Sequence, residues 1–417
     1  MASSVSQRPL GRRFRLLLSA SVCSGLGNGM AATAFPLLAA RMTDDARLVV
    51  GVTVASYLPW LLFGLPAGVL GDRYRPERLV PFVEGIRSLL LVAFAVVVAA
   101  GSRPILALYA VVFLITSGDT IFTGVTHAVV PRVAPADGLA RANGLMYSAQ
   151  TASENVLGPA LGGVLFVVAA SLPFIFDGAS FVVSGVLALV AVRGVMSHHE
   201  LVTTPTTFRA DLREGVRYFR ESSVLPVLLV LITGFAFCQA VMIGPLVLFA
   251  LHTLHLSSAG FGLMVGISSI GNVVGSLAAP RVLARLAPTK VLRAAGLVVA
   301  LSYLLAGISR SAVPATAALT LETIAVGVGV VAHVTLRQQV LDPAMFARAG
   351  NIFRTATMGI MPVGALVGGV LAQSIGLRAP LIGAACLQFL VVVVATPLLA
   401  RRCSVRQQDH VLVSAGS

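Results

Sequence analysis

The chain has 417 residues, of which 57% are hydrophobic and 11% are charged, and its mean hydropathy is +0.92. These values exclude an ordinary soluble globular domain with one large core. The formal net charge is +14, but the basic residues lie in short loops between apolar runs. This pattern is typical of a membrane protein and argues against a nucleic-acid partner.

The apolar runs are about twenty residues long, the length that carries a helix across roughly 30 Å of hydrocarbon. In chain order they predict six membrane helices, a polar stretch and six further helices. The expected fold class is therefore an all-α membrane protein. The twelve expected spans are residues 14–40, 48–70, 80–100, 104–130, 140–168 and 173–196, then 225–251, 258–281, 289–309, 313–337, 346–373 and 379–400.

Basic residues gather in every second loop. If the N-terminus lies inside, the cytoplasmic segments hold most of them, as the positive-inside rule requires. We therefore expect a multi-pass protein of a bacterial inner membrane with both termini in the cytoplasm. The basic residues on that side would be Arg12, Arg13, Arg15, Arg73, Arg75, Arg78, Arg132, Arg141, Arg281, Arg285, Lys290, Arg293, Arg401, Arg402 and Arg406.

The polar stretch contains the pattern of an amphipathic helix. Phe208, Leu212, Val216 and Phe219 share one face, and arginines occupy the other faces. We expect this helix to lie on the anionic cytoplasmic leaflet, which makes membrane lipids a predicted partner. A solvated connector is the alternative.

An internal repeat relates the two halves. VAPADGLARANGL from Val133 resembles VLDPAMFARAGNI from Val340, and GPALGGVL from Gly158 resembles VGALVGGVL from Val363. The similar spacing predicts two parallel copies with a substrate path between them. The predicted divisions are an N-terminal six-helix bundle at 1–196, a linker at 197–224, a C-terminal six-helix bundle at 225–402 and a cytoplasmic tail at 403–417.

The sequence carries no pattern for a cofactor or for enzymatic chemistry. Its four cysteines show no CxxC or Cys/His spacing, so neither a metal site nor a disulfide is expected. The motifs GxxxxGK[ST], HExxH and GxSxG do not occur. We therefore expect no cofactor, no metal and no enzyme activity.

The clearest motif is GVLGDRYRPERL, from Gly68 to Leu79. It resembles the loop signature of the major facilitator superfamily. EGIR from Glu84, LARAN from Leu139 and FDGASF from Phe176 are further matches. The chain looks most like bacterial drug and siderophore exporters that include macrolide-efflux proteins. This resemblance implies two parallel six-helix repeats and an export function.

The same loop is interpreted as a cytoplasmic gate. Asp72 can accept hydrogen bonds from a neighbouring helix, while the nearby arginines can face lipid phosphates or acids. The motif departs from the family at residues 75–77, and the second half has Ala279 where the first has Asp72. Glu84 and Arg87, three residues apart on one helix face, are added to the gate. The predicted gate residues are Gly68, Asp72, Arg73, Arg78, Glu84 and Arg87.

A carboxyl group in the middle of a membrane span costs at least a few kcal/mol and requires an explanation. Asp119 and Glu154 lie near the middle of two consecutive spans. Two acids in one dry cavity do not both stay ionised at low cost, so this pair is a candidate proton-coupling site. The alternative is that each acid only ties helices together. Asp177 is expected to cap or pack a helix end.

Polar side chains at similar depths are candidates for a substrate path. They are Asn28, Gln150, Asn155, Gln239, Asn272 and Glu322. Together these features predict a secondary active transporter that exports a small amphipathic or lipophilic compound in exchange for protons. Substrate and protons are the expected partners, and a monomer is expected. Two alternatives stay open: an importer or uniporter of one metabolite, and a sensor or scaffold that keeps the fold without transporting.

Overall fold

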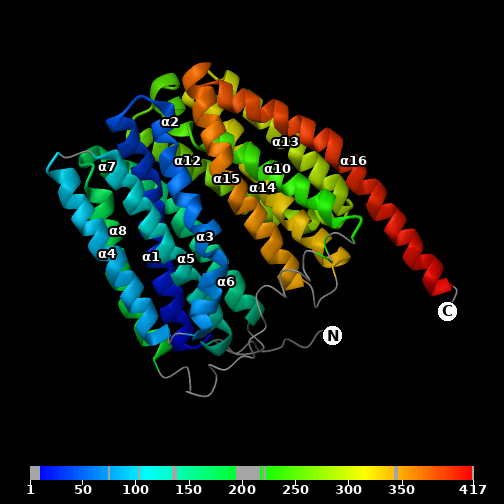
Figure 1. The fold of residues 1–417 in the computed structure, drawn as a ribbon, viewed down its shortest axis with the longest axis horizontal. Helices are drawn as coiled ribbons and strands as arrows, with labels where there is room; N and C mark the ends of the chain where they lie inside the picture. The colour runs from blue at the N-terminus through cyan, green and yellow to red at the C-terminus, as the bar shows by residue number, and fades with distance from the viewer. Residues whose placement is uncertain are drawn as a thin grey trace. The chain divides into compact units, whose positions relative to one another are not determined.

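The structure is a computed structural model (Figure 1). It describes residues 10–73, 76–101, 104–133, 139–193, 217, 219, 222–341 and 346–415. The regular elements of these residues are all helices. In chain order they are α1 (Arg12–Met42), α2 (Ala46–Val49), α3 (Gly51–Arg73), α4 (Pro76–Ala99), α5 (Ile105–Val133), α6 (Leu139–Thr151), η2 (Ala152–Leu157), α7 (Gly158–Val168), α8 (Leu172–Val192), α10 (Leu225–Ile243), α11 (Leu246–Leu248), η3 (Phe249–Thr253), α12 (Ser258–Leu283), α13 (Pro288–Ile308), α14 (Ala312–Val340), α15 (Phe346–Ser374) and α16 (Ala379–Ala415).

Within the described ranges, twelve helices are long and apolar enough to cross a membrane. They match the predicted spans in number and order, which confirms the predicted all-α membrane fold. Their outward faces carry large apolar side chains such as Leu89, which is 70% exposed, and Leu106, which is 77% exposed. A surface of this kind is stable where lipid rather than water is the solvent.

Three spans differ from the expected continuous helices. The span at 140–168 is interrupted by the π-helical turn η2, and the span at 225–251 breaks at Gly244 and Pro245. Proline explains both breaks, because Pro159 and Pro245 give no backbone N–H to the preceding turn. In contrast, α16 continues through residues 403–415, which were predicted to form the tail. Residues 398–415 contain neither proline nor glycine to end it earlier.

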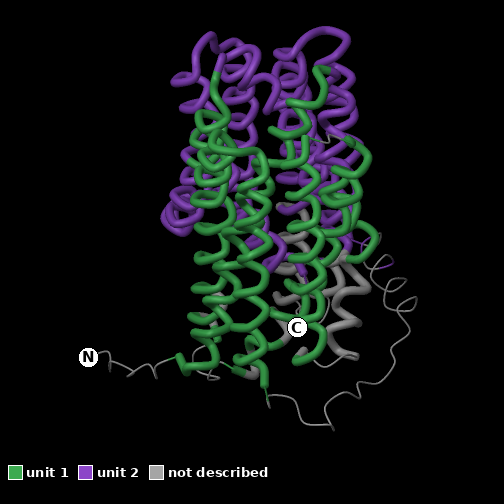
Figure 2. Tube along the Cα trace, turned by 90° about the vertical axis from the view of Figure 1, so that its left-hand side faces the viewer, with its two compact units in different colours: residues 1–44, 55–204, 256–266 green, residues 45–54, 205–255, 267–417 purple. Residues whose placement is uncertain are grey.

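The chain divides into two compact units (Figure 2). Unit 1 comprises Met1–Asp44, Ala55–Thr204 and Leu256–Gly266, and unit 2 comprises Asp45–Val54, Pro205–His255 and Ile267–Ser417. Each unit therefore includes a short segment from the other half of the sequence. The segment α2 and the start of α3 belong to unit 2, and the first turns of α12 belong to unit 1.

The same helix contacts build each unit. In unit 1, α1 packs against α7 and α8, and α4 packs against α5 and α8. In unit 2, α10 packs against α15 and α16, and α13 packs against α14 and α16. These pairs correspond in chain order, so the repeat in the sequence is also a repeat in structure.

Glycines make the closest helix crossings possible in both units. A Cβ on Gly158 of α7 would lie 2.6 Å from the Cα of Gly29 in α1. A Cβ on Gly364 of α15 would lie 2.7 Å from the carbonyl oxygen of Phe237 in α10. Because the facing atoms are backbone atoms, the crossings require the absence of a side chain.

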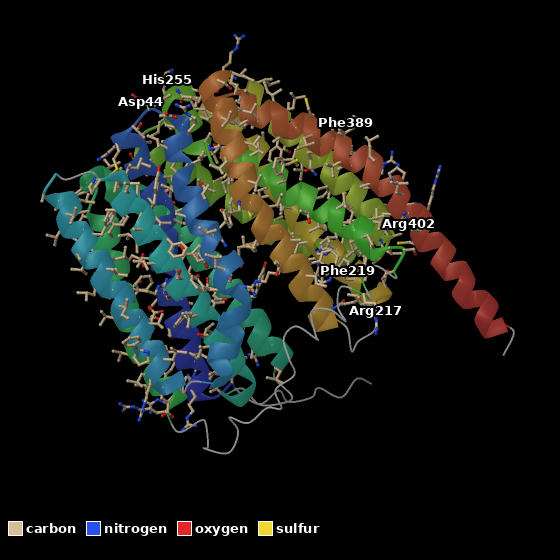
Figure 3. All side chains as sticks on the ribbon, viewed as in Figure 1. Asp44, Arg217, Phe219, His255, Phe389 and Arg402 are labelled. Atoms are coloured by element: carbon tan, nitrogen blue, oxygen red, sulfur yellow. The ribbon has the colours of Figure 1, made fainter. Side chains whose placement is uncertain are left out.

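Phe219 and Arg402 hold the start of α10 within unit 2 (Figure 3). The Phe219 side chain is 6% exposed, and its ring centroid lies 5.3 Å from that of Phe353 in α15. The Nη1 of Arg402 in α16 donates a 2.7 Å hydrogen bond to the carbonyl oxygen of Ser223. Apart from residues 217 and 219, the predicted amphipathic stretch at 208–219 lies outside the described residues.

We expect Gly158→Ala to lower the stability of the purified protein by about 1–3 kcal/mol, the usual range for overpacking. The added Cβ would meet the backbone of Gly29. The matched control is Gly144→Ala on α6, because a Cβ there meets nothing within 4 Å. Size-exclusion chromatography of heated samples gives the melting temperatures. Equal melting temperatures for the two variants would contradict the close crossing of α1 and α7.

Candidate functional site

A charged cluster in unit 1 centres on Arg87 of α4, which is 1% exposed. Its Nη1 donates to Oε1 of Glu84 at 3.1 Å, and its Nη2 donates to Oδ1 of Asn28 at 2.6 Å and to Oδ1 of Asp119 at 3.3 Å. The Nδ2 of Asn28 donates to the same Asp119 oxygen at 2.8 Å. Helices α1, α4 and α5 thus meet at one guanidinium group. We call these four residues the Arg87 network.

The register of α4 explains why Glu84 and Arg87 belong to this network. The predicted helix began at residue 80, whereas α4 begins at Pro76, a residue that suits the first turn because it lacks an N–H. Glu84 therefore lies more than two turns into the helix and is 1% exposed. The structure connects the two residues to the predicted proton site, while the predicted gate residue Arg78 is exposed near the start of α4.

Small residues let the helices approach the network. A Cβ on Gly118 of α5 would lie 2.6 Å from the Cδ of Arg87, so the arginine stem passes over bare backbone. On α1, Gly25 and Gly29 lie one turn apart and face η2, with Gly29 also against Gly158 of α7. Gly27 lies on another face of α1, against Asp177 and Ser180 of α8. These glycines let α1, which carries Asn28, approach both neighbours closely.

Helix α8 adds an aromatic ring and a further acid. The ring centroid of Phe181 lies 3.8 Å from the guanidinium carbon of Arg87, a cation–π contact. Asp177 is fully buried, accepts a 3.3 Å hydrogen bond from the Ser180 hydroxyl at Oδ1, and has no partner at Oδ2 among the described atoms. It lies within electrostatic reach of Arg87 and Glu84. The sequence analysis expected a cap here and missed this proximity.

Glu154 lies in the π-helical turn η2 and is half-buried. Turns of this kind are uncommon and frequently mark functional sites. Asp119 and Arg87 are the charged groups that act on Glu154 electrostatically. In the described structure, Glu154 makes no hydrogen bond to either of them. The predicted pair of Asp119 and Glu154 is thus linked through charge, with Arg87 as the shared cation.

Acids outnumber cations in this part of unit 1. Among the described groups, Glu84, Asp119, Glu154 and Asp177 bring four carboxyls to the one guanidinium of Arg87. If all four were ionised, an excess of negative charge would remain, at a cost that is largest for the buried Glu84 and Asp177. Protonation of some of these acids would lower that cost, and the position of the guanidinium influences which acids stay ionised.

Three predicted gate residues lie at the end of α3: Gly68, Asp72 and Arg73. The side chains of residues 64–76 lie outside the described part of the structure. The gate assignment of these three residues therefore stays a prediction.

The other predicted path residues fall in both units. In unit 1, Gln150 on α6 is half-buried and Asn155 on η2 is exposed. In unit 2, Gln239 on α10 and Asn272 on α12 are half-buried. Glu322 on α14 is 3% exposed. The role of these residues in a path stays a prediction.

Glu322 has one polar partner that sequence reasoning missed. The hydroxyl of Tyr303 on α13 donates a 3.3 Å hydrogen bond to Oε1 of Glu322. A separate cavity of about 510 Å³ in unit 2 is lined by Thr253, Ile382 and residues 375–379. None of the predicted path residues lines this cavity.

Comparison with known proteins now adds the family. Residues 6–413 match the family described as transmembrane secretion effectors. The chain is also similar to macrolide efflux protein A of Enterococcus faecalis, with 24% identity over 193 residues. That alignment covers 46% of this chain and 59% of the relative, so the chain spans less than two thirds of it.

Solved transporter structures resemble the fold over nearly its whole length. The inward-facing bacterial homologue of the iron transporter ferroportin has a TM-score of 0.72 at 15% identity, covering 95% of this chain and 99% of that one. A bacterial homologue of the lysosomal transporter Spinster gives 0.73 at 15% identity, and PepTSo of the POT family gives 0.77 at 12%, both with 95% and 99% coverage. At these identities the likeness shows the fold alone.

The family match across nearly the entire chain and the twelve described spans lead to one assignment. The protein belongs to the transmembrane secretion effector family of the major facilitator superfamily, whose members are membrane transporters and not enzymes.

Proposed function

We propose that this transporter exports a small lipophilic compound, with a macrolide as the first candidate, in exchange for protons. The macrolide candidate rests on the similarity to macrolide efflux protein A. The exchange rests on the Arg87 network, where one buried guanidinium serves more carboxyl groups than it can neutralise. This excess of acids is the observation that carries the proposal.

Protons and Arg87 compete for Asp119. A proton on Asp119 removes the charge that holds Nη2 of Arg87 at 3.3 Å, so the guanidinium turns towards Glu84. Loss of that proton draws Arg87 back to Asp119 and Asn28. Because the three contacts come from α1, α4 and α5, each protonation step changes how these helices are held. Such a step can couple an ion to a conformational change.

A positive charge on the substrate would link its binding to the release of a proton. Many macrolides carry a basic amine, and a cation near Asp119 and Glu154 favours the ionised form of both acids, so a proton leaves. A proton from outside then restores the neutral form once the substrate has gone. A membrane potential of 100 mV contributes about 2.3 kcal/mol for each charge moved inward. This term favours proton entry, and it drives export of a cationic substrate only if more protons enter than substrate charges leave.

The orientation and the gate complete the proposal. Both termini lie in the cytoplasm, because the basic loops then obey the positive-inside rule. The loop with Gly68, Asp72, Arg73 and Arg78 closes the cytoplasmic side, and basic segments contact anionic lipid headgroups. The transporter acts as a monomer in the inner membrane of a bacterium.

Import or uniport of one metabolite is the alternative. Uniport needs no proton site, yet unit 1 buries Glu84 and Asp177 and places Asp119 and Glu154 within membrane spans, at a cost of a few kcal/mol for each ionised acid. The described acids therefore favour coupling to protons. The direction of transport is decided by measuring accumulation on each side of the membrane.

We expect Asp119→Asn to abolish proton-driven transport. The amide keeps the size of the acid but stays uncharged, so Arg87 is never drawn back. Uptake driven by the proton gradient should therefore fall to the level measured without a gradient. The measurement is uptake of radiolabelled erythromycin into inside-out vesicles energised by a proton gradient.

The matched control for this experiment is Asp45→Asn. Hydrogen bonds from Arg47 lower the pKa of Asp45, a half-buried residue outside the spans, so it stays ionised throughout a neutral assay. We expect uptake at the wild-type rate. Proton dependence that survives Asp119→Asn would remove Asp119 from the coupling site. If wild-type uptake does not depend on the proton gradient, the protein is a uniporter and the proposed exchange is wrong.

We expect Arg87→Met to destabilise the protein by about 3–5 kcal/mol, because it leaves buried acids without their cation. Adding Asp119→Asn should recover part of this loss, since the acid that Arg87 contacts at 3.3 Å is then neutral. Melting temperatures of the two single variants and the double variant measure the coupling. Exposed Arg310 provides the control substitution Arg310→Met. Strictly additive losses would show that Arg87 and Asp119 do not act as a pair.

A further inference from the structure

Unit 2 contains a buried acid that the Arg87 network does not use. Between residues 225 and 400 the sequence has two acidic residues, Glu322 and Asp342. Asp342 lies outside the described residues, whereas Glu322 lies within α14 and is 3% exposed. It is thus the one acid in the described spans of this half. A charged carboxyl at such a place costs a few kcal/mol unless a cation is near.

The groups around Glu322 do not include a described cation. From α13, the hydroxyl of Tyr303 donates to Oε1 of Glu322 at 3.3 Å, and Tyr303 is 1% exposed. From α10, the fully buried Cys238 thiol lies near Tyr303 and brings no positive charge. From α12, Gly271 and Gly275 pack against Thr320, Thr323 and Ile324 of α14, and Asn272 and Ser276 contact Gly327. With a phenol as its partner and no charge to balance it, the carboxyl is stable as a neutral acid.

The fold does not require an acid at this position. Helices α5 and α14 both have 29 residues, and each end of α14 lies 207 residues after the corresponding end of α5. Glu322 therefore occupies the place of Ile115, which is 4% exposed in unit 1. Because an apolar side chain packs this site in the other repeat, packing alone does not explain the acid.

The acid lies where α14 is held by two neighbours. The hydroxyl of Thr323, the next residue, donates to the carbonyl oxygen of Ser268 on α12. Glu322 itself faces α13 through Tyr303. A change of charge on Glu322 would therefore act on the contact between α13 and α14 while Thr323 keeps α14 attached to α12.

We propose that Glu322 and Tyr303 form a second proton-binding site, in unit 2, which is loaded and emptied during transport. A proton from water forms an O–H bond at Oε2, the carbonyl oxygen Oε1 accepts from Tyr303, and the same O–H bond breaks when the proton returns to water. Tyr303 keeps its own proton throughout. This proposal rests on the proposed proton exchange and adds one proton to it.

The first experiment needs no substrate. Infrared difference spectra of the full-length protein in lipid vesicles, recorded as the pH is raised, should show the C=O stretching band of a protonated carboxyl group. We expect Glu322→Gln to remove one component of this band and Tyr303→Phe to shift that component to higher frequency, because the C=O loses a hydrogen-bond donor. Glu322→Ile, which installs the residue found in unit 1, should fold and lack the same component.

The second experiment measures the role in transport. Erythromycin uptake into vesicles is followed at several proton concentrations, and the apparent proton order should fall by about one in Glu322→Gln. An infrared spectrum that Glu322→Gln leaves unchanged would overturn the site. A lost component with an unchanged proton order would overturn its part in the cycle.

The two experiments separate this inference from the proposed function. If Asp119→Asn abolishes proton-driven uptake while Glu322→Gln leaves both measurements unchanged, exchange stands and the second site is wrong. If the wild type shows no proton-driven uptake, exchange itself fails, and with it the loading and emptying of Glu322. The infrared band then still reports whether Glu322 binds a proton.

Discussion

The attraction between the buried guanidinium of Arg87 and the acids around it holds three helices of unit 1 together. In bulk water two opposite charges 4 Å apart gain only about 1 kcal/mol, but at a lower effective dielectric the same pair gains several times more. Arg87 is 1% exposed, so its contacts to Glu84 and Asp119 fall in the second regime. Those contacts join three helices. Under the proposed exchange, protonation of these acids and the arrangement of the three helices are coupled.

The two units share their packing but not their charges. Gly158 and Gly364 occupy matching helix crossings, because close contact of backbones allows no side chain in either unit. At the matching positions of α5 and α14, however, Asp119 corresponds to Val326, and Glu322 corresponds to Ile115. Each of these helices has an acid, and the two acids lie one turn apart in register. Close backbone contact requires glycine at these crossings in both units, whereas the fold does not require an acid at either position.

The sequence predicts the spans well because their signal is length and apolarity, which the bilayer imposes on every helix. It also identifies Asp119 and Glu154, because an acid inside a span is costly wherever it points. It does not predict the Arg87 network. The helix start at Pro76 moves Glu84 and Arg87 a turn deeper than expected, and only the folded structure shows which acid lies near that cation.

Other features escape sequence reasoning because they depend on contacts between distant segments. The π-helical turn η2 changes the direction of Glu154, and α-helical periodicity does not anticipate it. In the sequence, Asp177 resembles a helix cap. Only the packing of α8 against α4 shows that it lies near Arg87. Nothing in the sequence marks Tyr303 as a partner of Glu322, because a tyrosine near a helix end is common in membrane proteins. In each case the residue type is visible in the sequence, but its partner is not.

The glycines of α1 also constrain how this helix can move. Gly25 and Gly29 meet η2 and α7, whereas Gly27 meets α8 on another face, and none of these contacts leaves room for a Cβ. Helix α1 therefore has little space to move towards these neighbours. A shift along its own axis is less hindered, because no large side chain interlocks at these three positions. Asn28 accepts a hydrogen bond from Arg87 and donates one to Asp119, so such a shift would change both bonds together.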